Sequence, residues 1–337
     1  MSDQVKVGII GIGGLARSVH LPALSQIKTA RIEAVCDIIE ERARKAAEQY
    51  GIPKVYTLYK EMIAKEKLDA IFCIVQPDQL YRIVLDCLMA GLDVFMEKPP
   101  GITAFQAESL QFFAEKNNRI LQVGFNRRYI PVVQKTLEIM RELTPITHVE
   151  GTFLKHGTAS FCQGALSAFP SDTIHCVDLV RWIAGGKPVK AATVTGQVND
   201  VVKNAWFSVI KFDNDCLGIV RANYMTGGRT HAFEIHGPQA SAFINLGMGE
   251  NMVKSHIMVH GGKTSYSISS TGTQAQKYID LDGFELAGST ELHRYYGFYQ
   301  EDEAFLDCVL NRKKPLADIS EGAASMRMVE MLLAAEI

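Results

Sequence analysis

The sequence lacks three features that would each point to a particular class of protein. It has no Cys-x-x-Cys pair, and its seven cysteines are scattered and odd in number. That pattern argues against a bound metal or a disulfide framework and favours reduced, buried thiols. No apolar run is long enough to span a bilayer, and no signal peptide is visible before the first expected strand. We therefore expect a soluble, cytoplasmic protein.

Neither sign of charge dominates the chain. Lys and Arg total 35, Asp and Glu total 37, and no long basic or acidic run occurs. This balance argues against a nucleic acid or a membrane surface as the main partner and favours small or neutral ligands. With 337 residues, 47% of them hydrophobic, the chain can form two domains that each have a core.

Short apolar runs alternate with helical patterns over residues 1–125. The expected strands cover residues 5–11, 31–36, 68–75, 93–96 and 120–125. The expected helices cover residues 15–28, 40–50, 78–90 and 104–116. Near-continuous apolar strands that alternate with helices predict an α/β domain with a parallel sheet covered on both faces.

The pattern changes after residue 125, where strands dominate. The expected strands cover residues 148–154, 191–198, 205–212, 217–224, 232–236, 241–246 and 256–260. The expected helices cover residues 131–143, 172–184, 293–311 and 320–335. Residues 126–337 are therefore expected to form an α+β domain on an open, mostly antiparallel sheet. Residues 206–212 and 217–224 carry apolar side chains on both faces, which predicts burial against a second subunit in a homodimer or homotetramer.

The first expected strand ends in a glycine turn, Gly11-x-Gly13, with Ala16 at the third position of a G-x-G-x-x-G pattern. Gly11 permits the tight turn, and Gly13 lets the backbone approach a pyrophosphate at the start of the next helix. Asp37 ends the second strand, where a carboxylate accepts hydrogen bonds from ribose hydroxyls and repels a 2′-phosphate. Alternatively, Asp37 caps the helix that begins at Glu40. The sequence predicts NAD rather than NADP, bound by Gly11, Ile12, Gly13, Gly14, Leu15, Asp37, Glu97 and Lys98.

Lys98 lies in the segment Glu97-Lys98-Pro99, at the carboxyl end of an expected parallel strand. Ligands bind at this edge in open α/β sheets. A lysine buried near a nicotinamide ring would have a lowered pKa and could exchange a proton with a hydroxyl. Glu97 and Pro99 would hold the amine in one direction. The alternative is an ordinary surface lysine before a proline turn.

Asp172 and His175 form the second candidate pair. Residues three apart share a helix face, so the histidine could take a hydroxyl proton as hydride leaves while the aspartate orients it. Alternatively, Asp172 is a helix N-cap and His175 is a half-buried histidine. His20, on the first expected helix, is expected to be structural. The candidates for substrate contact are Arg127, Arg128, Tyr129, Lys155 and His156.

Together these residues resemble the glucose–fructose oxidoreductase, inositol dehydrogenase and MocA family (Gfo/Idh/MocA) over nearly the whole chain. The matching elements are the glycine turn, Asp37, Ala90-Gly91-x-x-Val94 before Glu97-Lys98-Pro99, Asn126-Arg127-Arg128-Tyr129, and Asp172…His175-x-x-Asp178-x-x-x-Trp182. The resemblance implies a Rossmann domain followed by a domain whose sheet often mediates dimers or tetramers. It also implies that Lys98, Asp172 and His175 surround the nicotinamide and the reacting carbon of a sugar, inositol or related polyol.

We therefore expect an NAD-dependent dehydrogenase that acts on CH–OH groups. His175 would be the general base, Lys98 would polarise or protonate the substrate oxygen, and Asp172 would orient the pair. Two alternatives stay open: a non-catalytic NAD-binding sensor, and a redox-assisted lyase or glycosidase that removes hydride and returns it. The three catalytic candidates argue against the sensor, whereas Leu80, where many family members carry a histidine, argues mildly for it.

Overall fold

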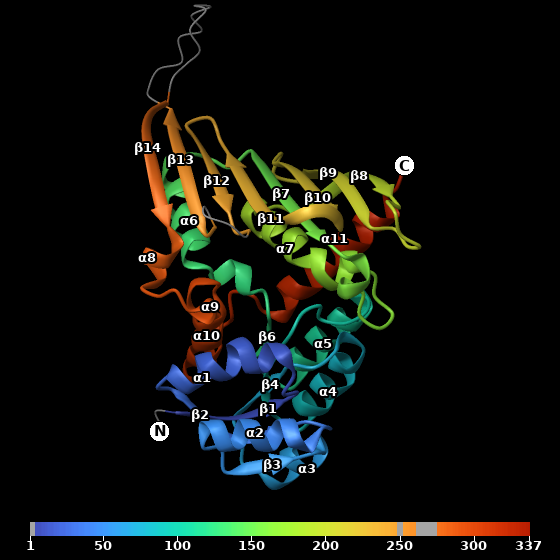
Figure 1. Cartoon of the computed structure of the whole chain (residues 1–337), viewed down its shortest axis with the longest axis vertical. Helices are drawn as coiled ribbons and strands as arrows, with labels where there is room; N and C mark the ends of the chain where they lie inside the picture. The colour runs from blue at the N-terminus through green and yellow to red at the C-terminus, as the bar shows by residue number, and fades with distance from the viewer. Residues whose placement is uncertain (1–3, 248–251, 261–274) are drawn as a thin grey trace, which may run out of the picture. The chain divides into compact units, whose positions relative to one another are not determined.

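The computed structural model describes residues 4–247, 252–260 and 275–337. They form two compact units that do not follow the linear order of the chain. The first unit holds residues 1–129, 161–174 and 291–330, and the second holds residues 130–160, 175–290 and 331–337. Each unit is built on one sheet (Figure 1).

The first unit has a six-stranded parallel sheet in the order β3-β2-β1-β4-β5-β6. Its strands are β1 (Val5–Ile10), β2 (Ala30–Cys36), β3 (Lys54–Tyr56), β4 (Ala70–Cys73), β5 (Asp93–Met96) and β6 (Leu121–Val123). Every residue of β4 and β5 is buried, which requires helices on both faces. This arrangement confirms the expected Rossmann class, a fold in which ligands bind at the carboxyl ends of the strands.

Local sequence explains most of the helices in this unit. A helical run after β1 starts as a π-helix, η1 (Ala16–His20), and continues as α1 (Leu21–Gln26). The Thr103 side chain caps the start of α5, and Pro77 occupies the first turn of α4, where the missing N–H costs nothing. The other helices of this part are α2 (Glu40–Tyr50), α3 (Tyr59–Lys65), α4 (Pro77–Met89), α5 (Ala104–Lys116), η2 (Asn126–Tyr129) and η4 (Phe169–Thr173).

Residues 291–330 return to the first unit and complete its core. The helix expected over residues 293–311 is divided into α9 (Leu292–Tyr295) and α10 (Phe298–Asn311), because Gly297 adopts a φ of 87° between them. The Phe305 ring of α10 lies 5.3 Å from the Phe72 ring and 5.9 Å from the Phe95 ring. The last helix, α11 (Ile319–Ala334), follows α10.

The second unit has an eight-stranded sheet in the order β14-β13-β12-β11-β7-β10-β9-β8. Only the β7–β10 pair is parallel among these described strands. The expected open, mostly antiparallel sheet is therefore confirmed. Its strands are β7 (His148–His156), β8 (Pro188–Gly196), β9 (Ala205–Phe212), β10 (Leu217–Asn223), β11 (Met225–His236), β12 (Ala240–Asn245), β13 (Lys254–His260) and β14 (Ala275–Asp282).

Helices α6 (Pro131–Leu143) and α7 (Ile174–Ala184) lie against one face of this sheet, and α8 (Gly283–Ala287) follows β14 (Figure 1). Gly151 of β7 faces α7 so closely that a Cβ atom there would lie 2.5 Å from the Cys176 sulfur. Side chains of β9 and β10 alternate between the two faces. On the face away from α7 they expose apolar residues: Phe207, Val209 and Leu217.

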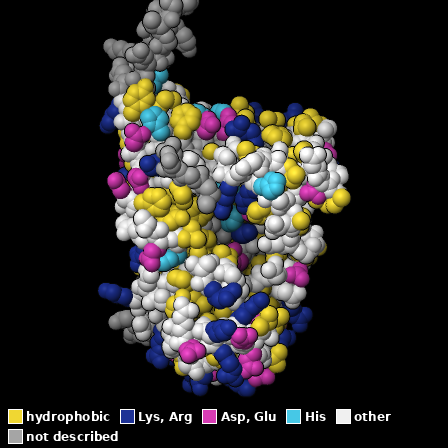
Figure 2. Space-filling model, in the orientation of Figure 1, with side chains coloured by type: hydrophobic (Ala, Val, Ile, Leu, Met, Phe, Trp, Pro, Cys, Tyr) yellow, Lys and Arg dark blue, Asp and Glu magenta, His cyan; other side chains and the backbone are white. Residues whose placement is uncertain are grey.

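The surface shows no large field of one charge sign on the face in view, where Lys and Arg are interspersed with Asp and Glu (Figure 2). Within the described part of the chain, no helix combines the length and apolar character needed to cross a membrane. The same residues contain no group of three or more His, Cys, Asp or Glu side chains arranged to hold a metal ion. All seven cysteines are free thiols.

Candidate active site

The turn after β1 is shaped by a glycine that no other residue could replace. Gly11 has a φ of 92°, and a Cβ atom there would lie 2.2 Å from the carbonyl oxygen of Ile74. Gly13 and Gly14 instead face open space: apart from the adjoining backbone, no heavy atom of the described residues lies within 4 Å of a Cβ built on either one. The turn therefore presents bare backbone at the start of a helical run, which is the surface that a pyrophosphate requires.

Asp37 follows β2 and is fixed against the same turn. Its Oδ2 accepts the Ile12 backbone N–H at 2.7 Å, and its Oδ1 accepts the Ile39 N–H at 2.8 Å. The N-cap position of α2 is Ile39, which makes no side-chain capping bond, so Asp37 is not the cap of this helix. Each oxygen of an ionised carboxylate can accept about two hydrogen bonds. Asp37 can therefore accept further hydrogen bonds from ribose hydroxyls while it stays in place.

Lys98 directly follows β5, at the carboxyl edge of the parallel sheet. Its Nζ donates a hydrogen bond to the Ser171 carbonyl at 2.9 Å, which joins it to η4. Burial lowers the pKa of Lys98, and the carboxylates of Asp172 and Glu97 offset only part of that effect. The Arg127 guanidinium lowers the pKa of Lys98 further. An amine in this state is suited to proton exchange with a bound hydroxyl.

The structure brings Lys98 and Asp172 together within the first unit. Asp172 is partly exposed and follows the residue whose carbonyl Lys98 contacts. His175 lies in the first turn of α7, is 8% exposed, and belongs to the second unit. Because η4 is a π-helix, the α-helical rule that residues three apart share a face does not carry over to this junction. The partnership of His175 with Lys98 and Asp172 therefore stays a prediction.

Two family models match most of the chain. The oxidoreductase family, NAD-binding Rossmann fold of Gfo/Idh/MocA matches residues 5–125, and its C-terminal alpha/beta domain matches residues 167–336. The chain belongs to the Gfo/Idh/MocA oxidoreductase family. The first unit is accordingly an NAD-binding Rossmann unit, and the resemblance seen in the sequence is confirmed.

Similar proteins in the family are dehydrogenases by name. The inositol 2-dehydrogenase/D-chiro-inositol 3-dehydrogenase of Lactiplantibacillus plantarum is 36% identical over 129 residues, which cover only 37% of each chain. The myo-inositol 2-dehydrogenase of Thermotoga maritima is 25% identical over 255 residues, or 71% of this chain and 75% of that one. The crystal structure of a dehydrogenase from Chromobacterium violaceum has a TM-score of 0.85 with 20% identity, covering 99% of this chain and 95% of that one. The structural match shows that the fold is shared.

In this Gfo/Idh/MocA protein, three residues expected to contact substrate are buried in η2. Arg128 is fully buried, and its guanidinium donates to the Leu316 carbonyl at 3.0 Å and to a carboxylate of α11. Tyr129 is 7% exposed, and burial raises its pKa. Arg127 is 4% exposed, and its charge acts on Lys98. Contact between these three residues and a substrate stays a prediction.

The second unit places Lys155 and His156 on opposite faces of β7, because side chains alternate along a strand. Lys155 is buried, and its ammonium lies 4.6 Å from the ring centre of Phe153. The Phe153 ring stacks on His231 of β11 at 3.8 Å. His156 is exposed. The structure therefore does not bring the two candidates together, and it adds a buried histidine that carried no motif in the sequence.

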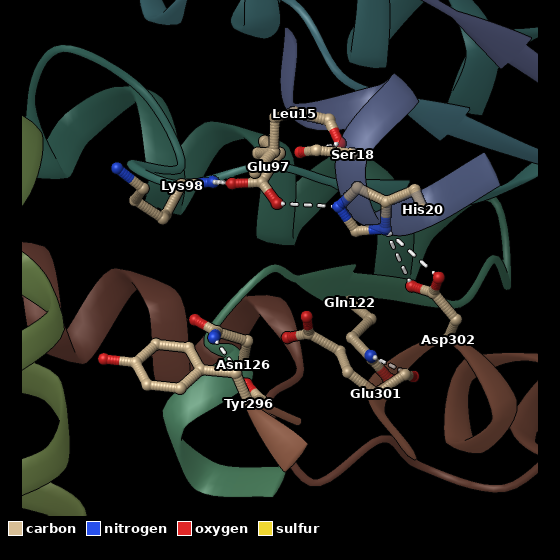
Figure 3. A network of polar contacts seen from close by, with 10 residues as sticks. All are labelled: Leu15, Ser18, His20, Glu97, Lys98, Gln122, Asn126, Tyr296, Glu301 and Asp302. Atoms are coloured by element: carbon tan, nitrogen blue, oxygen red, sulfur yellow. Dashed lines mark hydrogen bonds and ion pairs between the residues drawn. The ribbon is translucent and has the colours of Figure 1, made fainter. Parts of the chain in front are cut away.

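A buried polar network beside Lys98 was also missed in the sequence (Figure 3). His20 is fully buried between two carboxylates: its Nε2 lies 3.1 Å from Glu97 Oε1, and its Nδ1 lies 3.0 Å from Asp302 Oδ1. A carboxyl oxygen faces each ring nitrogen at hydrogen-bond distance, and an imidazole can donate to both only when it carries a proton on each nitrogen. Burial opposes that charge, but Asp302 and Glu97 outweigh it and raise the pKa of His20 to about 10. His20 is therefore an imidazolium at neutral pH.

Proposed function

We propose that the protein is an NAD-dependent dehydrogenase that oxidises a CH–OH group of a sugar, an inositol or a related polyol. The observation that carries the proposal is the state of Lys98. It is an amine with a lowered pKa, influenced by Asp172, at the carboxyl end of β5 in an NAD-binding Rossmann unit. The inositol dehydrogenase names of two relatives support this class of substrate.

In the proposed oxidation, each residue of the chain would have a separate role. NAD, when bound, supplies the acceptor for the hydride that leaves the carbinol carbon. His175 takes the hydroxyl proton, Lys98 polarises or protonates the substrate oxygen, and Asp172 orients these groups. Residues 1–125 bind the dinucleotide, and residues 126–337 bind the substrate and the partner subunit. The proposed substrate contacts are Arg127, Arg128, Tyr129, Lys155 and His156.

NAD is proposed in preference to NADP. The Asp37 carboxylate is 7% exposed and fixed by the Ile12 N–H, so it would repel a 2′-phosphate on the adenosine ribose. Ile38, the next residue, is 88% exposed and carries no charge that could attract a phosphate. Arg44, on α2, forms an ion pair with Glu40 at 2.5 Å. The charges near the ribose site therefore favour the cofactor that lacks the phosphate.

The test begins with titrations of the purified protein with NAD and NADP. A panel of sugars and inositols is then monitored for NADH absorbance. We expect tighter binding of NAD than of NADP, and reduction of NAD by at least one member of the panel. Tight NAD binding without reduction would favour the sensor or the redox-assisted lyase. Failure to bind either dinucleotide would contradict the proposal as a whole.

We also propose that the chain forms a homodimer or homotetramer through the exposed face of its eight-stranded sheet. Side chains of three adjacent strands present apolar surface there: Val194 of β8 is 54% exposed, Val209 of β9 is 55% exposed, and Leu217 of β10 is 54% exposed. Adjacent apolar residues on a strand surface lose solvent contact when a second copy covers them. A sheet face can also pair with itself about a twofold axis.

A charge placed on this face is expected to weaken the assembly. We expect native mass spectrometry to give a dimer or tetramer for the unmodified protein and a shift towards monomer for Val209→Asp. Val201→Asp is the matched control, because Val201 is 89% exposed in the loop after β8. A monomeric unmodified protein, or equal effects of both substitutions, would contradict the proposed interface.

A cytoplasmic location is proposed on the state of the thiols. All seven cysteines are free. Buried free thiols such as Cys73 and Cys87 have pKa values raised by burial and are therefore poorly reactive. Cysteines that stay as free thiols are typical of proteins in a reducing compartment.

A further inference from the structure

Glu97 and Lys98 are adjacent in the chain, yet their charged groups point apart. In Figure 3 the Lys98 amine extends away from the Glu97 carboxylate, which is turned towards His20. The Lys98 amine instead donates to the Ser171 carbonyl at 2.9 Å. Side chains of adjacent residues in extended backbone start out on opposite sides, but a Glu97 carboxylate without other partners could still turn towards the ammonium. The contacts that fix the direction of Glu97 therefore decide whether the two charges pair.

His20 and Asp302 fix that direction. The His20 imidazolium contacts Glu97 Oε1 at 3.1 Å, and Asp302 contacts the opposite ring nitrogen with both oxygens, at 3.0 and 3.1 Å. The other Glu97 oxygen accepts the Lys98 backbone N–H at 3.1 Å. Both carboxylate oxygens of Glu97 are thus engaged, one by the imidazolium and one by the peptide group that carries the lysine.

Aromatic rings prevent the imidazole from turning. The His20 ring lies 5.3 Å from the Phe95 ring and 5.6 Å from the Phe298 ring, edge to face in both cases. His20 and Asp302 are both fully buried, so water does not compete for their hydrogen bonds. The orientation of Glu97 is therefore fixed by packing as well as by charge.

We propose that His20 is a positioning residue: clamped by Asp302, it holds the Glu97 carboxylate away from the Lys98 amine and so leaves that amine free for the substrate. The proposal depends on the proposed function only for the role of Lys98 in the reaction. The arrangement of the four side chains can be tested without substrate or cofactor.

The charged groups around Lys98 differ from those around His20. Lys98 is influenced by Asp172 of η4, by Glu97, and by Arg127 of η2. His20 is faced by Asp302 of α10 and by Glu97. Glu97 contacts His20 through one carboxylate oxygen and the Lys98 backbone N–H through the other, so we expect the influence of His20 on the amine to pass through Glu97. Replacement of both His20 and Glu97 in one protein can isolate this influence.

The experiment measures the protonation of the Lys98 amine by trace acetylation with acetic anhydride as a function of pH. Mass spectrometry quantifies the peptide that carries Lys98, and Lys116, exposed on α5, is the internal reference. We expect His20→Gln to raise the midpoint of Lys98 labelling by about one pH unit, because the released Glu97 pairs with the ammonium. In protein that already carries Glu97→Gln, we expect the same replacement to move the midpoint by less than about 0.3 pH unit.

Two further variants separate positioning from general disturbance of the fold. His293→Gln replaces another buried histidine of the first unit, one that pairs with Glu291, and should leave the midpoint unchanged. Asp302→Asn keeps the imidazole of His20 but weakens its positive charge, so this variant should move the midpoint of Lys98 labelling in the same direction as His20→Gln. If His20→Gln does not give a cooperative thermal melt, Asp302→Asn is used in its place. Equal shifts with and without the Glu97 carboxylate, no shift in either protein, or the same shift in His293→Gln would overturn the proposal.

The outcome is distinguishable from failure of the proposed function. If no polyol reduces NAD but the labelling depends on His20 through Glu97, the clamp stands and the proposed reaction fails. If NAD is reduced but labelling is indifferent to His20, the reaction stands and the clamp fails.

Discussion

Lys98→Met is expected to lower kcat for NAD reduction by about 10²- to 10⁴-fold, the usual contribution of a positioned acid or base. Methionine nearly matches the length of the lysine side chain, so the packing at the end of β5 should be kept. The proton of the amine and its hydrogen bond to the Ser171 carbonyl are both lost. Because Lys98 is also a predicted contact of NAD, we expect the dissociation constant for NAD to rise as well, but by a smaller factor than the loss in kcat. Steady-state kinetics with the best substrate of the panel and an NAD titration measure the two effects separately.

The matched control is Lys116→Met. Lys116 lies in the last turn of α5 in the same unit and is exposed, so its loss should leave both quantities unchanged. If Lys98→Met kept more than about a tenth of the original kcat, proton exchange by this amine could not be a main part of the reaction.

Removing the charge of His20 is expected to destabilise the fold by about 3–5 kcal/mol near neutral pH, because it leaves the fully buried Asp302 without its cation and breaks the contact of His20 with Glu97. The pKa of His20 is raised from 6.5 to about 10 in the folded protein. A group with a raised folded pKa contributes stability below its unfolded pKa and loses that contribution as the pH rises through the folded value. The free-energy difference between the original protein and His20→Gln should therefore be largest at about pH 6.5 and decline towards pH 10.

Urea unfolding of both proteins at several pH values measures this difference. Subtraction of the variant cancels groups that titrate alike in both proteins. Lys98 does not cancel, because His20→Gln is expected to raise its pKa, and its contribution acts in the opposite direction to that of His20. Asp302 adds a separate contribution at lower pH, since burial raises its pKa from 3.8 to about 6 despite the His20 charge. A difference that is independent of pH between 6.5 and 10 would mean that His20 is not charged in the folded protein.

Elements with local boundary signals were predicted well from the sequence. The helix expected at residues 104–116 has those bounds in the structure, where the Thr103 side chain caps it. The helix expected at residues 131–143 also has those bounds and starts at a proline. In contrast, β3 and β14, which were not predicted, are edge strands of their sheets. An edge strand is defined by pairing with a neighbour, and the residues of the strand carry only weak information about that pairing.

The residues of the candidate site show the same difference between local and long-range signals. Gly11, Asp37 and Lys98 could be proposed as site residues from the sequence because each stands at a strand end within a short contiguous pattern. His20 and Asp302 are 282 residues apart, and a carboxylate in a helix has the same local pattern whether it is exposed or paired with a buried histidine. Arg128 was proposed from the sequence as a substrate contact, and its burial depends on contacts to Leu316 and α11 that the sequence did not indicate. The burial and partners of such residues depend on packing between segments far apart in the chain. This packing leaves no periodic pattern in the sequence.

The return of residues 291–330 to the first unit has a consequence during synthesis. At about 5–20 residues per second, β1 leaves the ribosome roughly 15–60 seconds before α10 does. Throughout that interval Phe72 and Phe95 lack the Phe305 ring that packs on them, and His20 lacks Asp302. The aromatic core of the first unit therefore stays uncovered on this side until α10 is made. That core and the His20–Asp302 pair are completed only after the entire second sheet has been synthesised.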